Sequence, residues 1–234
     1  MDLDPTFLIV DSSPAEFGAT ELQVAEIQDY SYVAGPGRRC VVWLAGCRRR
    51  CPGCFQPQFF SFAVGRRYRV EELAERILAI QGIDGVTFSD GEPFEQSSAL
   101  AELCRILKSR TDLSLLAYTG YQVEWLRGAD DQYCDFLDTL DVVIDGEYRE
   151  NEAGTYLWRG SRNQRIIFLK GEANPEALNA SSTVQQEIQL TVTSSNVLLT
   201  GFPDERSSRD LEASLKKKGI ITAPAKKVAD DGEA

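Results

Sequence analysis

Residues 41–58 read VVWLAGCRRRCPGCFQPQ and carry two signals in succession. The first four residues are apolar and mostly β-branched or aromatic, which predicts a short buried strand. Three cysteines follow at spacings of four and three residues: Cys47, Cys51 and Cys54. On a helix they would share one face, but Pro52-Gly53 interrupts helical continuation. We therefore predict a strand followed by a loop that curls its cysteines around a bound group.

Strands and helices alternate on the C-terminal side of this stretch. Apolar residues recur at helical spacing over residues 70–81, with charged residues on the opposite face. Further strands are predicted at 86–88, 113–118 and 141–144, with helices through 100–107 and 133–140 between them. Such alternation indicates βαβ units, so the predicted fold is α/β with a parallel sheet and right-handed crossovers.

Four loops leave the carboxyl ends of the predicted strands. They are the cysteine loop, SDGEP at residues 89–93, YTGY at residues 118–121 and the turn at Asp145. Ligands of open α/β sheets and of barrels bind at this end of the strands. We therefore expect the four loops to meet on one edge of the sheet and to form the functional site there.

The alternation loosens beyond residue 150. The polar segment RGSRNQR precedes strands predicted near 166–169, 187–192 and 197–199 and a last helix predicted over 204–218. The final residues, AKKVADDGEA, have a composition typical of disorder. We expect an N-terminal extension (1–28), a core domain (29–203) and a C-terminal helix with a disordered tail (204–234).

Composition and charge exclude several classes of function. The 234 residues have a formal net charge of -11 and include no histidine, which excludes His-based triads and His-ligated metal sites. The acidic balance argues against binding to nucleic acid or to anionic membranes. Because the sequence shows neither a secretory signal nor a membrane-spanning apolar stretch, we expect a cytoplasmic protein. Arg48, Arg49 and Arg50 concentrate positive charge at the cysteine loop, as a solvated loop or as a docking patch for an acidic partner.

The cysteine triplet favours an iron-sulfur cluster. Three thiolates on a glycine-bearing loop can each reach a different iron, and three ligands for four irons leave one iron open. The main alternative is a zinc site completed by Cys40, although zinc knuckles usually pair two C-x-x-C motifs and Cys40 falls in the strand pattern. Cys104 and Cys134 lie in helical patterns, where we expect them to be buried.

The motifs together resemble a known superfamily. Cysteines at this spacing before an aromatic residue, with a glycine-acidic-proline turn downstream, resemble the radical S-adenosylmethionine superfamily. Six blocks resemble, in order, those of the anaerobic ribonucleotide reductase activating enzymes: VAGPGRRCVVWLAGC, CRRRCPGCFQ, GVTFSDGEPFEQ, YTGYQVEWL, DVVIDGEY and RGSRNQRII. The resemblance covers about residues 33–169.

This resemblance implies a fold, cofactors and partners. The implied fold is a partial (β/α) barrel of parallel strands, here with N- and C-terminal extensions. The implied cofactors are one 4Fe-4S cluster on the three cysteines and S-adenosylmethionine on the open iron, where it is reductively cleaved to a 5′-deoxyadenosyl radical. A glycyl radical enzyme is the expected substrate, and a flavodoxin- or ferredoxin-like protein the expected electron donor. No side chain is expected to act as a catalytic acid or base.

The resemblance also implies roles for individual residues. The turn expected to receive the methionine ammonium consists of Ser89, Asp90, Gly91, Glu92 and Pro93. Phe55 is expected to pack against adenine, Thr119 and Gly120 to lie within reach of the cofactor, and Asp145 to meet the ribose or a positive group. Each of these residues has a plain alternative as part of a turn or of the core. The residues of an expected substrate or partner loop, which as an alternative is merely solvated, are Arg159, Ser161, Asn163 and Gln164.

Asp90 departs from the family pattern, because it stands where the family has the first glycine of the turn. This difference from the family bears on the identity of the substrate more than on the presence of the cluster. Two alternatives therefore stay open beside the activating enzyme. One is radical modification of a peptide or small molecule, and the other is a non-catalytic iron-sulfur module for sensing or binding.

Overall fold

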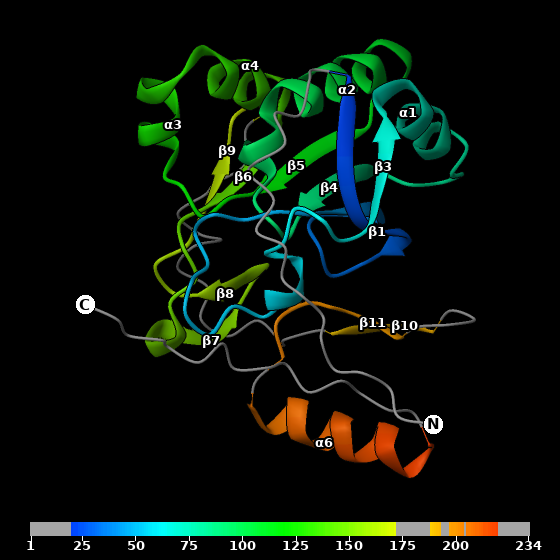
Figure 1. Cartoon of the computed structure of the whole chain (residues 1–234), viewed down its shortest axis with the longest axis vertical. Coiled ribbons are helices and arrows are strands. Elements are labelled where there is room, and N and C mark those ends of the chain that lie inside the picture. The colour runs from blue at the N-terminus through cyan, green and yellow to red at the C-terminus, as the bar shows by residue number, and fades with distance from the viewer. Residues whose placement is uncertain (1–19, 172–187, 193–196, 204, 220–234) are drawn as a thin grey trace.

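A seven-stranded sheet forms the centre of the computed structural model, which describes residues 20–171, 188–192, 197–203 and 205–219. The strand order is β3-β1-β2-β4-β5-β6-β9 (Figure 1). The four inner strands run parallel: β2 (Arg39–Leu44), β4 (Gly85–Ser89), β5 (Ser114–Tyr118) and β6 (Val142–Asp145). The outer strands pair antiparallel: β1 (Glu21–Ser31), β3 (Arg66–Arg69) and β9 (Arg165–Phe168).

Helices cover one face of this sheet (Figure 1). They are α1 (Val70–Leu78), α2 (Ser97–Arg110), α3 (Val123–Ala129) and α4 (Asp131–Thr139). Side chains alternate between the two faces of a strand. In β2, Cys40, Val42 and Leu44 therefore pack into the helix-covered core, while Val41 and Trp43 belong to a separate cluster on the other face.

Two small hairpins lie on the other face of the sheet (Figure 1). They are formed by β7 (Ala153–Tyr156) with β8 (Arg159–Ser161), and by β10 (Gln189–Val192) with β11 (Val197–Thr200). Trp158, from the turn of the first hairpin, packs against the cluster that contains Leu116 and Ile144, and Leu198 of β11 packs against the cluster that contains Val41 and Trp43. The chain also has α6 (Glu205–Lys217) and 3-10 turns at Pro57–Phe59, Pro93–Gln96 and Glu150–Glu152.

The predicted α/β class with a parallel core is confirmed. The described sheet is open and shows no barrel closure, so the partial barrel stays a prediction. The predicted domain boundaries also stay predictions, although β1 spans the one placed at residue 28. The predicted tail disorder concerns residues 225–234, which lie outside the described part of the chain. Within that part, no helix is both long and apolar enough to cross a membrane.

The strand β1 was not predicted, and its pairing explains why. Its register on β2 shifts between Val24 and Glu26 and again between Gln28 and Ser31. Each such bulge adds a residue and reverses the faces on which the following side chains lie. The two-residue hydrophobic alternation that identifies a strand is therefore interrupted twice in the sequence of β1.

A buried arginine joins the amino ends of the parallel strands. The Arg39 side chain donates hydrogen bonds to the Thr87 hydroxyl at 2.6 Å and to the carbonyls of Val86 at 2.7 Å, Ser114 at 2.8 Å and Pro36 at 3.0 Å. Burial lowers the pKa of Arg39 to about 10. A planar group with five donors thus ties together β2, β4 and β5 at the edge opposite the predicted site.

We predict that Arg39→Lys lowers the free energy of unfolding by about 2–3 kcal/mol, because a lysine has too few donors for these acceptors and leaves some of them buried without a partner. Urea denaturation followed by circular dichroism measures this loss. The control is Arg66→Lys, since Arg66 forms an exposed ion pair with Glu72 and the change there should stay within about 0.5 kcal/mol. Equal losses in the two variants would contradict the role given to Arg39.

Candidate functional site

The cysteine loop, residues 45–56, begins at the carboxyl end of β2. Its first residues are fixed by backbone hydrogen bonds from Gly46 to Phe59 at 2.9 Å and from Cys47 to Phe60 at 3.1 Å. Gly46 has a φ of +92°, and a Cβ there would lie 2.1 Å from the ring of Phe62. Only glycine allows the chain to turn off the sheet at this point.

The three thiols of the triplet lie on this loop, Cys47 buried and Cys51 and Cys54 half-buried. Burial raises the pKa of Cys47 to about 11 and that of Cys54 to about 12. Backbone N–H groups of Arg49 and Arg50 oppose this rise by hydrogen bonding to Cys47. Such thiols become thiolates when a metal supplies the positive charge.

The donor set fits an iron-sulfur cluster better than a single metal ion. Cys40, the fourth ligand in the zinc alternative, is fully buried in the helix-side core, as predicted, and so does not join the triplet. Among the described residues, no three His, Cys, Asp or Glu side chains converge as ligands of one ion. A 4Fe-4S cluster, in contrast, takes each thiolate to a different iron. Cys104 is buried as expected, while Cys134 is half-buried.

The SDGEP turn packs directly against the start of the cysteine loop. The backbone N–H of Glu92 donates to the Gly46 carbonyl at 2.8 Å. Gly91 has a φ of +54°, and a Cβ there would lie 2.7 Å from the Leu44 carbonyl and 2.9 Å from that of Gly46. Gly91, the one glycine of SDGEP, is therefore required by this close approach of two backbones.

The Glu92 carboxylate links the SDGEP turn to the YTGY loop. It accepts hydrogen bonds from the Thr119 hydroxyl at 2.9 Å, the Gly120 N–H at 2.8 Å and the Phe94 N–H at 3.1 Å. Burial raises the pKa of Glu92 to about 7, and these hydrogen bonds limit the rise. The polar groups of Glu92, Thr119 and Gly120 thus form hydrogen bonds with one another inside the protein.

The turn after β6 completes the edge. The Asp145 carboxylate accepts from the Val123 N–H at 2.9 Å and from the Arg165 side chain at 2.9 and 2.5 Å, and is fully buried. Arg49 of the cysteine loop reaches over to Glu147 at 3.0 Å and lies over the Tyr121 ring. The predicted convergence of the four loops is therefore confirmed, and Asp145 is used there as the partner of Arg165.

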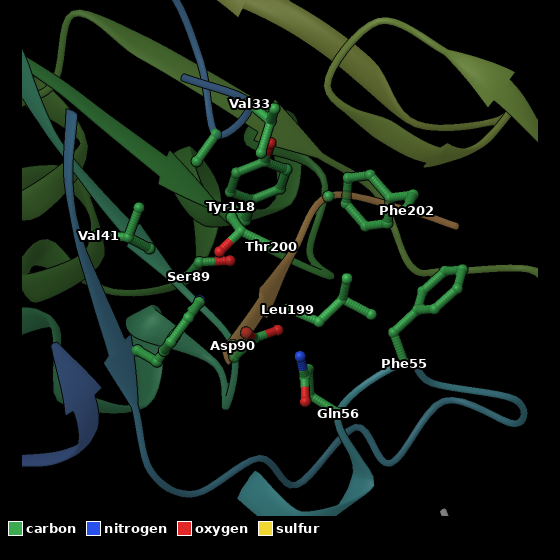
Figure 2. A pocket seen from close by; sticks show the side chains of 13 residues that line it. Val33, Val41, Phe55, Gln56, Ser89, Asp90, Tyr118, Leu199, Thr200 and Phe202 are labelled. Atoms are coloured by element: carbon green, nitrogen blue, oxygen red, sulfur yellow. The ribbon is translucent and has the colours of Figure 1, made fainter. Parts of the chain in front are cut away.

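A pocket of about 410 Å³, including its open mouth, lies beside the cysteine loop (Figure 2). Of the predicted site residues, Phe55, Ser89 and Asp90 line it. The other lining residues are Val33, Ala34, Val41, Trp43, Gln56, Tyr118, Leu199, Thr200, Gly201 and Phe202. Gly91, Glu92, Pro93, Thr119, Gly120 and Asp145 are not among the lining residues.

The C-terminal wall of the pocket was not predicted as part of a site. The Phe202 ring lies 5.4 Å from that of Phe55 and 6.1 Å from that of Tyr118, centre to centre. The Thr200 hydroxyl donates to the Gln28 side chain at 2.5 Å, which fixes β11 on β1. The only signal in the sequence was the apolar run at 197–199, which predicts a strand but not its position.

The alternative of a merely solvated RGSRNQR loop does not describe this segment, because several of its polar side chains are held inside the protein although Arg162 is exposed. The Gln164 side chain accepts from the Gly160 N–H at 2.9 Å and donates to the Gly146 carbonyl at 3.0 Å. Asn163 donates to the Glu147 carbonyl at 2.8 Å. Arg159, Ser161 and Gln164 are buried. These residues support the turn after β6, and their expected part in binding a substrate or partner stays a prediction.

We predict that Thr119→Val lowers the free energy of unfolding by about 1–3 kcal/mol, because the buried Glu92 carboxylate loses a donor without a change in side-chain shape. Thermal or urea unfolding checks the value. Thr155→Val is the matched control, since Thr155 is half-buried and none of the hydrogen bonds described here involves it. The role of Thr119 is refuted if its variant is as stable as the control.

Comparison with known proteins places the chain in a family. Residues 33–167 match the sequence model of the 4Fe-4S single cluster domain. The chain is 33% identical over 141 residues to the anaerobic ribonucleoside-triphosphate reductase-activating protein of Enterobacteria phage T4, covering 58% of this chain and 86% of the relative. The protein of that name from Vibrio cholerae is 32% identical over 143 residues, 57% of this chain and 90% of its own length. The one from Escherichia coli K12 is 26% identical over 149 residues, 59% and 93% of the two chains. The chain therefore belongs to the 4Fe-4S single cluster domain family and to the family of the anaerobic ribonucleoside-triphosphate reductase-activating proteins.

Proposed function

We propose that this protein is a radical S-adenosylmethionine enzyme of the cytoplasm that activates an anaerobic ribonucleotide reductase by forming a glycyl radical on it. The observation that carries the proposal is the position of the three-cysteine loop, which leads directly into a pocket through Phe55 and Gln56. The names of the relatives support the partner, and the matching domain supports the cluster.

In this proposal Cys47, Cys51 and Cys54 hold the cluster. A cluster with three protein ligands keeps one iron open for S-adenosylmethionine and, once reduced, supplies the electron that splits it into methionine and a 5′-deoxyadenosyl radical. The chain itself positions the reactants and excludes water. Phe55 offers its ring to the adenine, and Ser89 offers a polar group at the end of β4.

The remaining residues around the pocket serve this proposal indirectly. Glu92, Thr119 and Gly120 hold the SDGEP and YTGY loops together behind the pocket. The apolar side chains of Val41, Trp43 and Leu199 exclude water from the pocket, which limits side reactions of a radical. A flavodoxin- or ferredoxin-like protein is the proposed electron donor.

Anaerobic reconstitution tests the proposed cluster. After anaerobic reconstitution the protein should bind about four iron and four sulfide per chain, and Cys47→Ala, Cys51→Ala and Cys54→Ala should each lose most of both. The same variants should form 5′-deoxyadenosine from S-adenosylmethionine at least about 100-fold more slowly than the wild type. Cys134→Ala, on a half-buried thiol of α4, is the control and should keep cluster and activity. One redox-silent zinc ion per chain would refute the cluster.

Electron paramagnetic resonance with a purified reductase tests the proposed substrate. The reduced protein, S-adenosylmethionine and a purified anaerobic ribonucleotide reductase should together give the electron paramagnetic resonance signal of a glycyl radical on the reductase. Deuterium at the α-carbon of the reductase's glycine should appear in the 5′-deoxyadenosine. Formation of 5′-deoxyadenosine without the glycyl signal would favour a peptide or small-molecule substrate. A cluster-bound protein that never cleaves S-adenosylmethionine would favour the sensing module.

A further inference from the structure

The SDGEP turn carries two carboxylates, Asp90 and Glu92, and the structure places them in different surroundings. Glu92 is 2% exposed and does not line the pocket. Its carboxylate is already engaged with the Thr119 hydroxyl and with two backbone N–H groups. To bind a positive group of a ligand, Glu92 would have to give up hydrogen bonds that hold the loops together.

Asp90, in contrast, lines the pocket and is half-buried. Figure 2 shows its carboxyl group directed to the side of the pocket formed by Leu199 and Gln56. Among the described residues, this carboxylate has no hydrogen bond and no ion pair. Burial raises the pKa of Asp90 to about 7, as expected for a carboxylate that lacks a protein partner.

The backbone at Asp90 is also unusual. Its φ is +48°, in the left-handed region that glycine adopts more easily than other residues. Non-glycine residues persist in this region only where the surrounding structure holds them there, and such positions cluster at active sites and ligand-binding sites. A glycine would adopt this φ at a lower energetic cost, so the shape of the turn does not explain why an aspartate stands at position 90.

The charges around the pocket indicate what this side chain binds. Asp90 is the only carboxylate among the lining residues, and none of them is lysine or arginine. A negative group in such a place is stabilised by a cation that the ligand brings.

Resting on the proposed function, we infer that Asp90, and not Glu92, is the carboxylate that pairs with a positive group of bound S-adenosylmethionine. This ligand carries an ammonium and a sulfonium beside a flat adenine ring. The pocket offers the matching features: one unpaired carboxylate and the aromatic side chains of Trp43, Phe55, Tyr118 and Phe202. Residues Leu199 to Phe202 form one wall of the pocket, and a wall of protein in place of water strengthens the attraction between opposite charges.

The test measures ligand affinity, without turnover, on the anaerobically reconstituted protein with an oxidised cluster. Isothermal titration compares S-adenosylmethionine, S-adenosylhomocysteine, which lacks the sulfonium charge, and 5′-methylthioadenosine, which lacks both positive groups. Asp90→Asn keeps the shape and removes the charge, and it should weaken S-adenosylmethionine binding at least about tenfold, the value of a charge-assisted hydrogen bond. Binding of 5′-methylthioadenosine should not change.

Two further variants separate binding from folding. Asp90→Gly should weaken S-adenosylmethionine binding as much as Asp90→Asn, while its melting temperature should be no lower than that of the wild type, because glycine adopts a φ of +48° without strain. Asp112→Asn removes a charge from an exposed loop before β5, at the opposite edge of the sheet, and should bind like the wild type.

The outcomes are distinct. Loss of affinity for both charged ligands assigns the ammonium to Asp90, loss for S-adenosylmethionine alone assigns the sulfonium, and either result supports the inference. Equal S-adenosylmethionine affinity in wild type and Asp90→Asn overturns it and leaves the proposed function standing. Equal losses for all three ligands overturn it as well, since they indicate a damaged pocket. A wild-type protein that does not bind S-adenosylmethionine overturns both the inference and the proposed function.

Discussion

The buried carboxylate of Glu92 is the interaction on which the arrangement of the site depends. Its backbone N–H holds the cysteine loop through Gly46, and its side chain holds the YTGY loop through Thr119 and Gly120. One residue therefore fixes the relative positions of loops that leave β2, β4 and β5. A buried carboxylate is costly in free energy unless its hydrogen bonds are made. Any movement of these loops that breaks those bonds would therefore destabilise the protein. Because the Glu92 carboxylate is engaged in the hydrogen bonds that hold the loops together, it cannot bind a ligand without breaking them.

Much of the fold could be predicted because the inner strands are buried on both faces. Their sequences are short apolar runs between turns, as in VVWL before the cysteine loop, and such runs are recognisable without alignment. The bulges in β1 interrupt its alternation of apolar and polar residues, so the sequence did not predict that strand. The convergence of the loops followed from topology alone, since parallel strands present their carboxyl ends on one edge.

The roles of single residues in the site could not be read in the same way. Asp145 ends a strand, as a ligand-binding residue often does, yet its carboxylate pairs with Arg165 of the neighbouring strand β9. The RGSRNQR segment is polar enough for a solvated loop, yet the Gln164 side chain satisfies backbone groups around it. In both cases the partner is distant in sequence or lies on another strand, and residue type gives no information on which polar partner a side chain will find.

The pocket is lined both by residues inside the family match and by residues beyond it, which bears on the choice of substrate. The family match ends at residue 167, and within it lie the cysteine loop, the SDGEP turn and Tyr118. Leu199 and Phe202 lie beyond the match but form the outer wall of the same pocket, held to β1 through Thr200 and Gln28. Under the proposed function, the groups that initiate chemistry therefore come from the matched part of the chain, and a segment outside it limits the space left for a reacting partner. The Phe202 ring contacts those of Phe55 and Tyr118, so in the proposed enzyme a protein loop would have to displace this ring or pass beside it, whereas a small molecule could fit within the wall.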